Sequence, residues 1–316
     1  MTSFNPPVRT LILALGIAGA LVSLPAAAAQ ADNSQASTAQ QATTQTAEHS
    51  VCACFEVTVV GEGPAVLLIP GLASSGDVWH STVEALQADY QLHVFTLAGF
   101  GGVMPLAHEA WEHGFLPTQQ EAILRYIRQQ QLSKPVVIGH SLGGYLALAL
   151  AATAPEAIGG AVNVDGLPAL GALFAQNAAS GIAAQEAAPA SFDPMAMAKE
   201  MTNNASWHPR IVNDMFRSDG QTSGRVMAEL MQADLRPALA SIRVPVLTLG
   251  ALQQGAPYST PEQVQANYES QLANAPAQYH SFAFAADSKH FIMADAPEWL
   301  TQQITQFLHS HAVIEE

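Results

Sequence analysis

The stretch that decides the fold runs Pro135-Val136-Val137-Ile138-Gly139-His140-Ser141-Leu142-Gly143-Gly144. Its apolar start predicts a buried strand, and the strong helix formers from Leu142 to Ala152 predict a helix directly after it. The pattern Gly-x-Ser-x-Gly lies between the two, where glycines permit a tight and strained turn. Such a turn exposes the hydroxyl of Ser141 at the end of a strand, with the next backbone amide free. The stretch therefore predicts a nucleophilic serine.

Apolar runs of strand length recur on both sides of this turn. Residues 55–60 alternate between apolar and polar side chains, as an edge strand does. Continuous apolar runs, which suit strands covered on both faces, occupy residues 65–69, 92–96, 135–139, 161–164, 244–249 and 280–284. Segments of helical composition fill many of the gaps between them. This alternation predicts an α/β fold with a mostly parallel, doubly wound sheet and helices on both faces.

Two helices have recognisable beginnings. The residues Thr118-Gln119-Gln120-Glu121 match a capping box, which predicts that a helix opens there. The last helix is predicted from about Pro297, with an apolar face that reaches Leu308. Both helices would pack an apolar face on the sheet.

Residues 167–241 break the alternation, because they contain no convincing strand. They lie between two sheet strands and are rich in alanine and methionine, which predicts a helical cap over the C-terminal edge of the sheet. The methionines of this segment are Met195, Met197, Met201, Met215, Met227 and Met231. These side chains either pack between helices or form an adaptable apolar lining for a substrate pocket.

The first 29 residues have the composition of a signal peptide. Arg9 precedes an apolar run from Thr10 to Leu24, and small residues follow as far as Ala29. This run is shorter than the ~20 residues that a transmembrane anchor needs, so no membrane span is expected in the mature protein. Residues 30–50 are almost all Gln, Ala, Ser and Thr and predict a disordered linker. We expect a secreted or periplasmic protein whose folded domain occupies residues 51–316.

Charge and cysteine content narrow the possible partners. The chain carries 11 basic and 26 acidic residues, for a net charge of −15. This argues against nucleic acid or an anionic membrane as a partner. Cys52 and Cys54, the only cysteines, form either a small local disulfide or two free thiols. His108 and His113 flank two glutamates, but their spacing matches no zinc motif, so no metal site is expected. The sequence leaves the oligomeric state open.

Several motifs beside the Ser141 turn resemble those of one family. These are Pro70-Gly71-Leu72 after the strand at 65–69, Ala98-Gly99-Phe100-Gly101-Gly102, Asp234-Leu235-Arg236-Pro237 before the strand at 244–249, and Ser288-Lys289-His290-Phe291 before Ala296-Pro297-Glu298. From about Phe55 to Leu308 the chain resembles the α/β-hydrolase superfamily, as a secreted member similar to serine esterases and lipases with a helical cap.

The resemblance implies a set of catalytic residues. Ser141 would be the nucleophile, and His290, which follows the last strand, would be its base because a serine hydroxyl needs one. The backbone amides of Leu72 and Leu142 would form the oxyanion hole. The family usually places the acid after the strand at 244–249, but residues 250–255 contain no carboxylate. Some members place it one strand earlier, which in this chain is Asp165.

Two other carboxylates remain weaker candidates for the acid. Asp287 lies three residues before His290, and Asp77 lies in the loop that carries Leu72. Alternatively, Asp165 caps the segment that follows it. The order Ser141, Asp165, His290 along the chain is the order found in this family.

The expected activity is hydrolysis of a carboxylic ester through an acyl-enzyme, without a metal or an organic cofactor. The partner would be a small-molecule ester or a related acyl compound, and a lactonase or an amide hydrolase would use the same residues. If the cap supplies an apolar acyl pocket, activity should rise from acetyl to medium-chain esters. A non-catalytic ligand-binding module on the same fold is the alternative from a different class.

Overall fold

The computed structural model describes residues 53–173, 193–253 and 260–311. All of them belong to one compact unit, Ser50–Glu316. The predicted signal peptide (1–29) and linker (30–50) lie outside the described residues, as does Cys52. Cys54 is disulfide-bonded, which decides against a free thiol at this position.

One sheet of seven strands forms the centre of the described unit, in the order β1-β3-β2-β4-β5-β6-β7. The strands are β1 (Phe55–Val60), β2 (Ala65–Ile69), β3 (Gln91–Leu97), β4 (Val136–His140), β5 (Gly160–Val164), β6 (Val246–Ala251) and β7 (His280–Ala285). Only β1, at one edge, pairs antiparallel with its neighbour; the other pairs are parallel. The mostly parallel sheet predicted from the apolar runs is confirmed.

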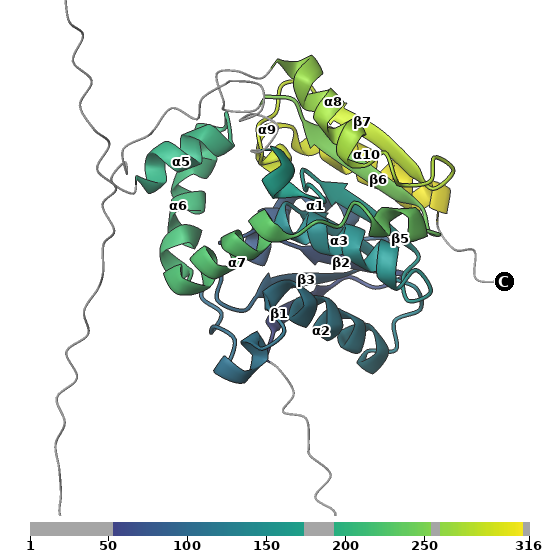
Figure 1. Cartoon of the computed structure of the whole chain (residues 1–316), viewed down its shortest axis with the longest axis horizontal. Helices are drawn as coiled ribbons and strands as arrows, with labels where there is room; N and C mark the ends of the chain where they lie inside the picture. Colours follow the sequence, from purple (N-terminus) through teal and green to yellow (C-terminus); the bar gives the residue numbers. More distant parts are fainter. Residues whose placement is uncertain (1–52, 174–192, 254–259, 312–316) are drawn as a thin grey trace, which may run out of the picture. The chain divides into compact units, whose positions relative to one another are not determined.

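Helices cover both faces of this sheet, so the prediction of a doubly wound sheet is also confirmed (Figure 1). The covering helices are α1 (His80–Leu86), α2 (Phe115–Gln129), α3 (Leu142–Thr153), α8 (Pro261–Gln271), α9 (Ile292–Asp295) and α10 (Pro297–His311). Side chains of α2, α3 and α8 share one apolar cluster, and those of α1, α9 and α10 share a second.

The buried strand β2 shows how the sequence builds these two clusters. Leu67 and Ile69 belong to the cluster under α2, α3 and α8, whereas Val66 and Leu68 belong to the opposite cluster. Successive side chains of a strand point to opposite faces, so a continuous apolar run is buried on both. Strand β4 lies between β2 and β5, and the chain segments that leave these strands meet at one edge of the sheet.

The described residues between β5 and β6 contain no strand, as expected for residues 167–241. We call this range the inserted segment. It includes α5 (Pro194–Met201), α6 (His208–Arg217) and α7 (Gly220–Gln232), which lie together beside the sheet (Figure 1). Asp214 of α6 accepts hydrogen bonds from the backbone N–H and the hydroxyl of Ser75, both at 2.8 Å. The inserted segment is therefore bonded to the loop after β2.

The predicted start of helix α2 is wrong. The helix begins at Phe115, and Thr118 lies inside it, where its hydroxyl donates to the Ala110 carbonyl at 2.9 Å. The free amides of the first turn are satisfied by Glu229 of α7, whose carboxylate accepts from Phe115 N at 2.7 Å and Leu116 N at 3.0 Å. A carboxylate at a helix N-terminus is favourable because the amides carry partial positive charge there. Glu229, which is distant in sequence, thus caps the helix in place of the predicted capping box at Thr118.

Candidate active site

Ser141 occupies a strained backbone position between β4 and α3. Its φ of 54° and ψ of −112° lie in a region that residues with a side chain rarely adopt. The flanking glycines make the turn possible: a Cβ at Gly139 would lie 1.9 Å from the Gly143 carbonyl oxygen, and one at Gly143 would lie 2.2 Å from the Ile69 carbonyl oxygen. The predicted turn from strand to helix is present, and it puts Ser141 on the wall of a pocket.

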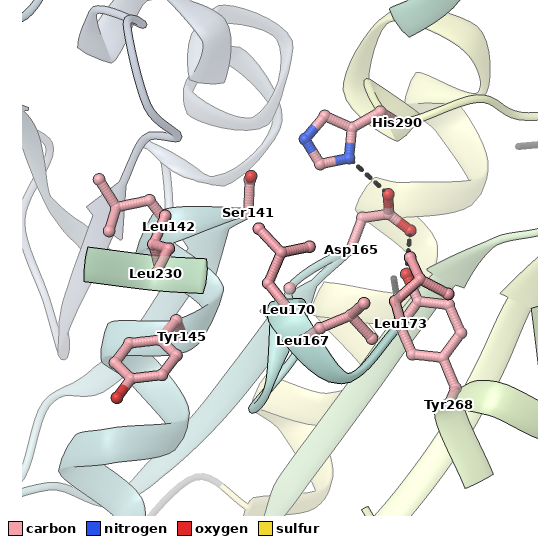
Figure 2. A pocket seen from close by; sticks show the side chains of 11 residues that line it. Ser141, Leu142, Tyr145, Asp165, Leu167, Leu170, Leu173, Leu230, Tyr268 and His290 are labelled. Carbon is pink, nitrogen blue, oxygen red and sulfur yellow. Dashed lines mark hydrogen bonds and ion pairs between the residues drawn. The ribbon is translucent and has the colours of Figure 1, made fainter. Parts of the chain in front are cut away.

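His290 and Asp165 meet at the same pocket. The imidazole Nδ1 of His290 lies 2.6 Å from Asp165 Oδ2. Asp165 directly follows β5, and His290 lies in the loop between β7 and α9. Figure 2 shows the Ser141 hydroxyl and the His290 ring on the same side of the pocket, with the carboxylate beside the ring. The structure thus brings together the three side chains that the sequence analysis named.

The second carboxylate oxygen of Asp165, Oδ1, has two hydrogen-bond partners. Oδ1 accepts from the backbone N–H of Ala251 at 2.7 Å and from the hydroxyl of Tyr268 at 2.6 Å. Tyr268 is 2% exposed. Burial, the negative charge of Asp165 and this hydrogen bond together raise the pKa of Tyr268 well above its ordinary value.

Tyr268 and its helix α8 were not predicted from the sequence. A signal was available: Thr260 and Gln263 form a reciprocal capping box at the start of α8, with Pro261 in the first turn. That pattern would have placed the helix. It would not have selected Tyr268 from the other residues of the helix.

His140 supports the position of His290. Its Nε2 lies 3.0 Å from the His290 carbonyl oxygen, and the two ring centroids are 4.6 Å apart. Burial, followed by the charge of His290, lowers the pKa of His140 well below its ordinary value, and the bond to the His290 carbonyl only partly opposes this. His140 is therefore neutral. Because a carbonyl only accepts, the proton of His140 lies on Nε2, and its buried Nδ1 has no hydrogen-bond partner.

The loop after β2 lies directly against Ser141. A Cβ at Gly71 would lie 3.1 Å from the Cβ of Ser141, so Leu72, the next residue, is near the serine. Leu142 is the first residue of α3, where backbone amides are free of helix partners. Leu72 and Leu142, whose amides are expected to form an oxyanion hole, thus lie near Ser141 on different elements. Ala73, with a φ of 54°, turns the loop directly after Leu72.

Asp295 connects the loop of His290 to the inserted segment. Its carboxylate accepts from the Thr202 hydroxyl and from the backbone of Asn203 and Asn204, and its other oxygen accepts from Lys289 N at 2.8 Å. In addition, the backbone N–H of Phe291 donates to the Met201 carbonyl at 3.0 Å. The residues on both sides of His290 are therefore hydrogen-bonded to this carboxylate or to the inserted segment.

The pocket itself is small and lined mainly by leucine side chains. Its volume is about 110 Å³. Besides the polar residues already described, its lining includes Leu142, Tyr145, Leu167, Leu170, Leu173 and Leu230. Figure 2 shows Leu167, Leu170 and Leu173 gathered between Ser141 and Tyr268. The inserted segment does supply an apolar lining, because four of these leucines belong to it.

The methionines of the inserted segment do not form this lining. Among the described residues that line the pocket there is no methionine. Met201 and Met215 pack against the apolar cluster under α1 and α10. Met195, Met197 and Met227 are 39%, 40% and 42% exposed. The described apolar lining of this pocket is therefore supplied by leucines and not by these methionines.

The other candidate acids and metal ligands lie elsewhere. Asp77 and Asp287 are exposed, and neither lines the pocket. Within residues 53–173, 193–253 and 260–311, no three His, Cys, Asp or Glu side chains come together in a way that could hold a metal ion. The pocket brings together the Ser141 hydroxyl, an imidazole with a buried carboxylate behind it, and Leu142 at the start of α3. Such a set can perform acyl transfer.

Comparison with known proteins supports the assignment of the fold. The family described as alpha/beta hydrolase fold matches residues 64–193. The chain has the α/β-hydrolase fold. The structure is similar to an enol-lactonase of Burkholderia xenovorans, with a TM-score of 0.62 and 17% identity over 81% of this chain and 96% of that one. It is also similar to a thermophilic esterase of Thermogutta terrifontis, with a TM-score of 0.62 and 20% identity over 81% and 94%.

At the sequence level the chain is similar to an esterase of bacteria. It is 35% identical over 108 residues to the pimeloyl-(acyl-carrier protein) methyl ester esterase of Vibrio parahaemolyticus. The match covers 34% of this chain and 39% of that relative. The chain thus matches well under half the length of this relative.

Proposed function

We propose that the protein is a serine hydrolase that cleaves carboxylic esters of small molecules through an acyl-enzyme. One observation carries the proposal: Ser141 stands on a strained turn at the same pocket as His290, whose Nδ1 is 2.6 Å from the buried carboxylate of Asp165. Strain of this kind persists where the surrounding structure enforces it, and it occurs often at active sites. The names of the relatives, which include esterases, support this class of substrate.

The reaction proceeds in two halves. Ser141 Oγ attacks the ester carbonyl carbon while His290 Nε2 takes its proton, and the amides of Leu72 and Leu142 stabilise the oxyanion. The tetrahedral intermediate collapses, the C–O bond to the alcohol breaks, and His290 returns the proton to the leaving oxygen. Water then repeats the sequence on the acyl-enzyme and releases the acid. Asp165 holds the imidazole in the tautomer with Nδ1–H and stabilises the imidazolium.

The first prediction is that Ser141→Ala abolishes both turnover and covalent labelling. The variant loses the only atom that can form the acyl-enzyme, and loss of a triad member costs roughly 10⁴-fold or more in kcat. We expect a fluorophosphonate to label the wild-type protein at Ser141, as read by intact mass and peptide mapping. Ser133→Ala, which removes an exposed hydroxyl far from the pocket, is the matched control. A wild-type protein that hydrolyses no p-nitrophenyl ester, lactone or anilide and takes up no label would be a binding module.

The second prediction concerns the length of the acyl chain. The pocket volume of about 110 Å³ is smaller than the ~150 Å³ cavity that admits benzene, so it holds only a few carbon atoms. This replaces the expectation of a rise to medium-chain esters. We expect kcat/KM to be highest for acetyl to butyryl esters and to fall beyond them.

Enlarging the pocket tests the same point. Leu230→Ala should move the optimum toward longer acyl chains, because Leu230 of α7 lines the pocket. Leu239→Ala is the matched control, since Leu239 is equally apolar and buried but does not line it. An unchanged profile in Leu230→Ala would show that the acyl group binds elsewhere.

We also propose that the protein is exported after removal of residues 1–29. The disulfide at Cys54 supports export, because disulfides persist in oxidising compartments. N-terminal sequencing of the protein from a periplasmic fraction should find a start near Ala29. A full-length chain confined to the cytosolic fraction would contradict the proposal. No helix in the described ranges is long and apolar enough to cross a membrane.

A further inference from the structure

The place where this family usually carries its acid is occupied here by hydrogen-bond donors. Strand β6 ends with Gly250 and Ala251 instead of leading into a carboxylate. The backbone N–H of Ala251 donates to Asp165 Oδ1 at 2.7 Å. The strand end next to β5 therefore supports the relocated acid.

Tyr268 approaches the same oxygen from helix α8. Its hydroxyl lies 2.6 Å from Asp165 Oδ1, and its ring packs edge-on against Phe284 with centroids 6.0 Å apart. Gly250 makes room for both rings, because a Cβ there would lie 2.9 Å from Phe284 Cδ1 and 3.0 Å from Tyr268 Cε2. The position of the Tyr268 ring thus depends on the absence of a side chain at Gly250.

The direction of this hydrogen bond is fixed by chemistry. A carboxylate only accepts, so the phenol must keep its proton. Burial and the neighbouring charge raise the pKa of Tyr268 well above the ordinary value, which keeps it protonated at neutral pH. Asp165 therefore receives two donors on Oδ1 and the imidazole Nδ1–H on Oδ2.

We propose that Tyr268 is a positioning residue, which holds the carboxylate of Asp165 in the orientation that serves His290. This inference rests on the proposed function and extends it. The Tyr268 hydroxyl has two effects on Asp165. It fixes the rotation of the carboxylate, and it draws part of the negative charge toward Oδ1, away from the oxygen that faces His290.

The test is Tyr268→Phe, which removes one oxygen and keeps the ring. We expect kcat/KM to fall by roughly ten- to hundredfold, the range set by one hydrogen bond to a charged group. The freed carboxylate concentrates its charge on the side of His290 and stabilises the imidazolium. Because the base must be neutral to act, the acidic limb of the kcat/KM profile should move to higher pH.

The matched control is Tyr126→Phe. Tyr126 also hydrogen-bonds a partly buried side chain, His93 Nδ1 at 2.7 Å, but it lies on α2 and does not line the pocket. It should leave the position of the acidic limb unchanged. Equal pH profiles for wild type, Tyr268→Phe and Tyr126→Phe would overturn the proposal.

A double substitution separates a positioning role from a merely structural one. If Tyr268 acts through the carboxylate, Tyr268→Phe should change kcat/KM less than threefold in an Asp165→Asn background. A loss as large as in the wild-type background would overturn the proposal. Fluorophosphonate labelling of Ser141 in the wild type reports on the proposed function separately, so the two can fail independently.

If Tyr268→Phe does not fold, ¹³C NMR of the tyrosines in the wild-type protein tests the same proposal. The chain has six tyrosines, and labelling their Cζ atoms with ¹³C gives one signal for each. One signal should shift on Asp165→Asn and should follow the titration of His290 in the wild type. If no tyrosine signal responds to either change, the inference is wrong.

Discussion

Asp165 sits in an unusual backbone conformation that asparagine would also tolerate. Its φ is 54°, in the left-handed region, where Asp and Asn are the most frequent residues after glycine. Its backbone N–H donates to the Leu249 carbonyl at 2.8 Å, which anchors it to β6. The change Asp165→Asn therefore removes the charge without disturbing the turn.

We expect Asp165→Asn to lower kcat by roughly 10³- to 10⁴-fold, by analogy with serine-protease triads, with little change in the unfolding temperature. Asp77→Asn and Asp287→Asn are matched controls, because both residues are exposed and outside the pocket. Each should change kcat by tenfold or less. A mild Asp165→Asn beside a crippling Asp287→Asn would reassign the acid. Steady-state kinetics on one short-chain ester decide between these outcomes.

The residues of the site that follow strand ends were predictable from the sequence, whereas Tyr268, which lies inside a helix, was not. Ser141, Asp165 and His290 each come after an apolar run, and the ends of parallel strands meet at one edge of a sheet. Tyr268 is inside a helix, and its role depends on which side chain its hydroxyl reaches across 103 residues of chain. No local pattern encodes that contact.

At the scale of elements, helix α2 depends on α7 for its first turn. Glu229 accepts from two backbone amides of α2, and Gly114, with a φ of 84°, admits the carboxylate at close range. A Cβ at Gly114 would lie 2.6 Å from Glu229 Oε1. The sequence predicted the helix but not its start, because the cap comes from another element.

Glu229→Gln should lower the free energy of unfolding by about 1–2 kcal/mol, since a neutral amide interacts less with the helix N-terminus and one of its two polar atoms is a donor. Urea denaturation at neutral pH measures the change. Glu84→Gln is the control, because Glu84 is exposed on α1 and bonds only to His80. Equal effects of the two substitutions would show that the cap contributes nothing.

For the whole molecule, three histidines lie partly or fully buried and neutral in the folded state. Burial lowers the pKa of His93 and lowers that of His140 strongly. It lowers the pKa of His280, which bonds to Thr248 Oγ1 at 2.9 Å, to about 4. In the unfolded chain these groups take up a proton near their ordinary pKa. Above that pH the three histidines are neutral in both the folded and the unfolded state, so they do not lower the free energy of unfolding.

As the pH falls from about 6.5 toward about 4, these histidines bind protons in the unfolded state but not in the folded state. The free energy of unfolding therefore decreases. For His280 the slope is at most about 1.4 kcal/mol per pH unit between these values. The lowered pKa values of His93 and His140 act in the same direction. Urea denaturation across this range should therefore show a steep decline. His280→Gln should make the decline shallower, whereas His309→Gln, at an exposed site, should not. A curve that is unaffected by His280→Gln would contradict this explanation.

The strands of the sheet were predictable from the sequence because each follows from a local pattern. Continuous apolar runs predicted the central strands, and alternation predicted the edge strand β1. The attachments of the inserted segment were not predictable. They consist of single polar side chains, Asp214, Glu229 and Asp295, that bond to distant loops. In the sequence alone, such residues cannot be distinguished from ordinary surface carboxylates.

Because of these attachments, the stability of the proposed active site depends on the inserted segment. Asp214 holds the loop of Leu72, and the Met201 carbonyl and the bonds to Asp295 hold the loop of His290. A partial opening that released the inserted segment would free both loops, although the sheet would remain folded. Gentle heating should then inactivate the protein before the sheet melts. Amide hydrogen exchange at Ser75 and Phe291 would report this early step.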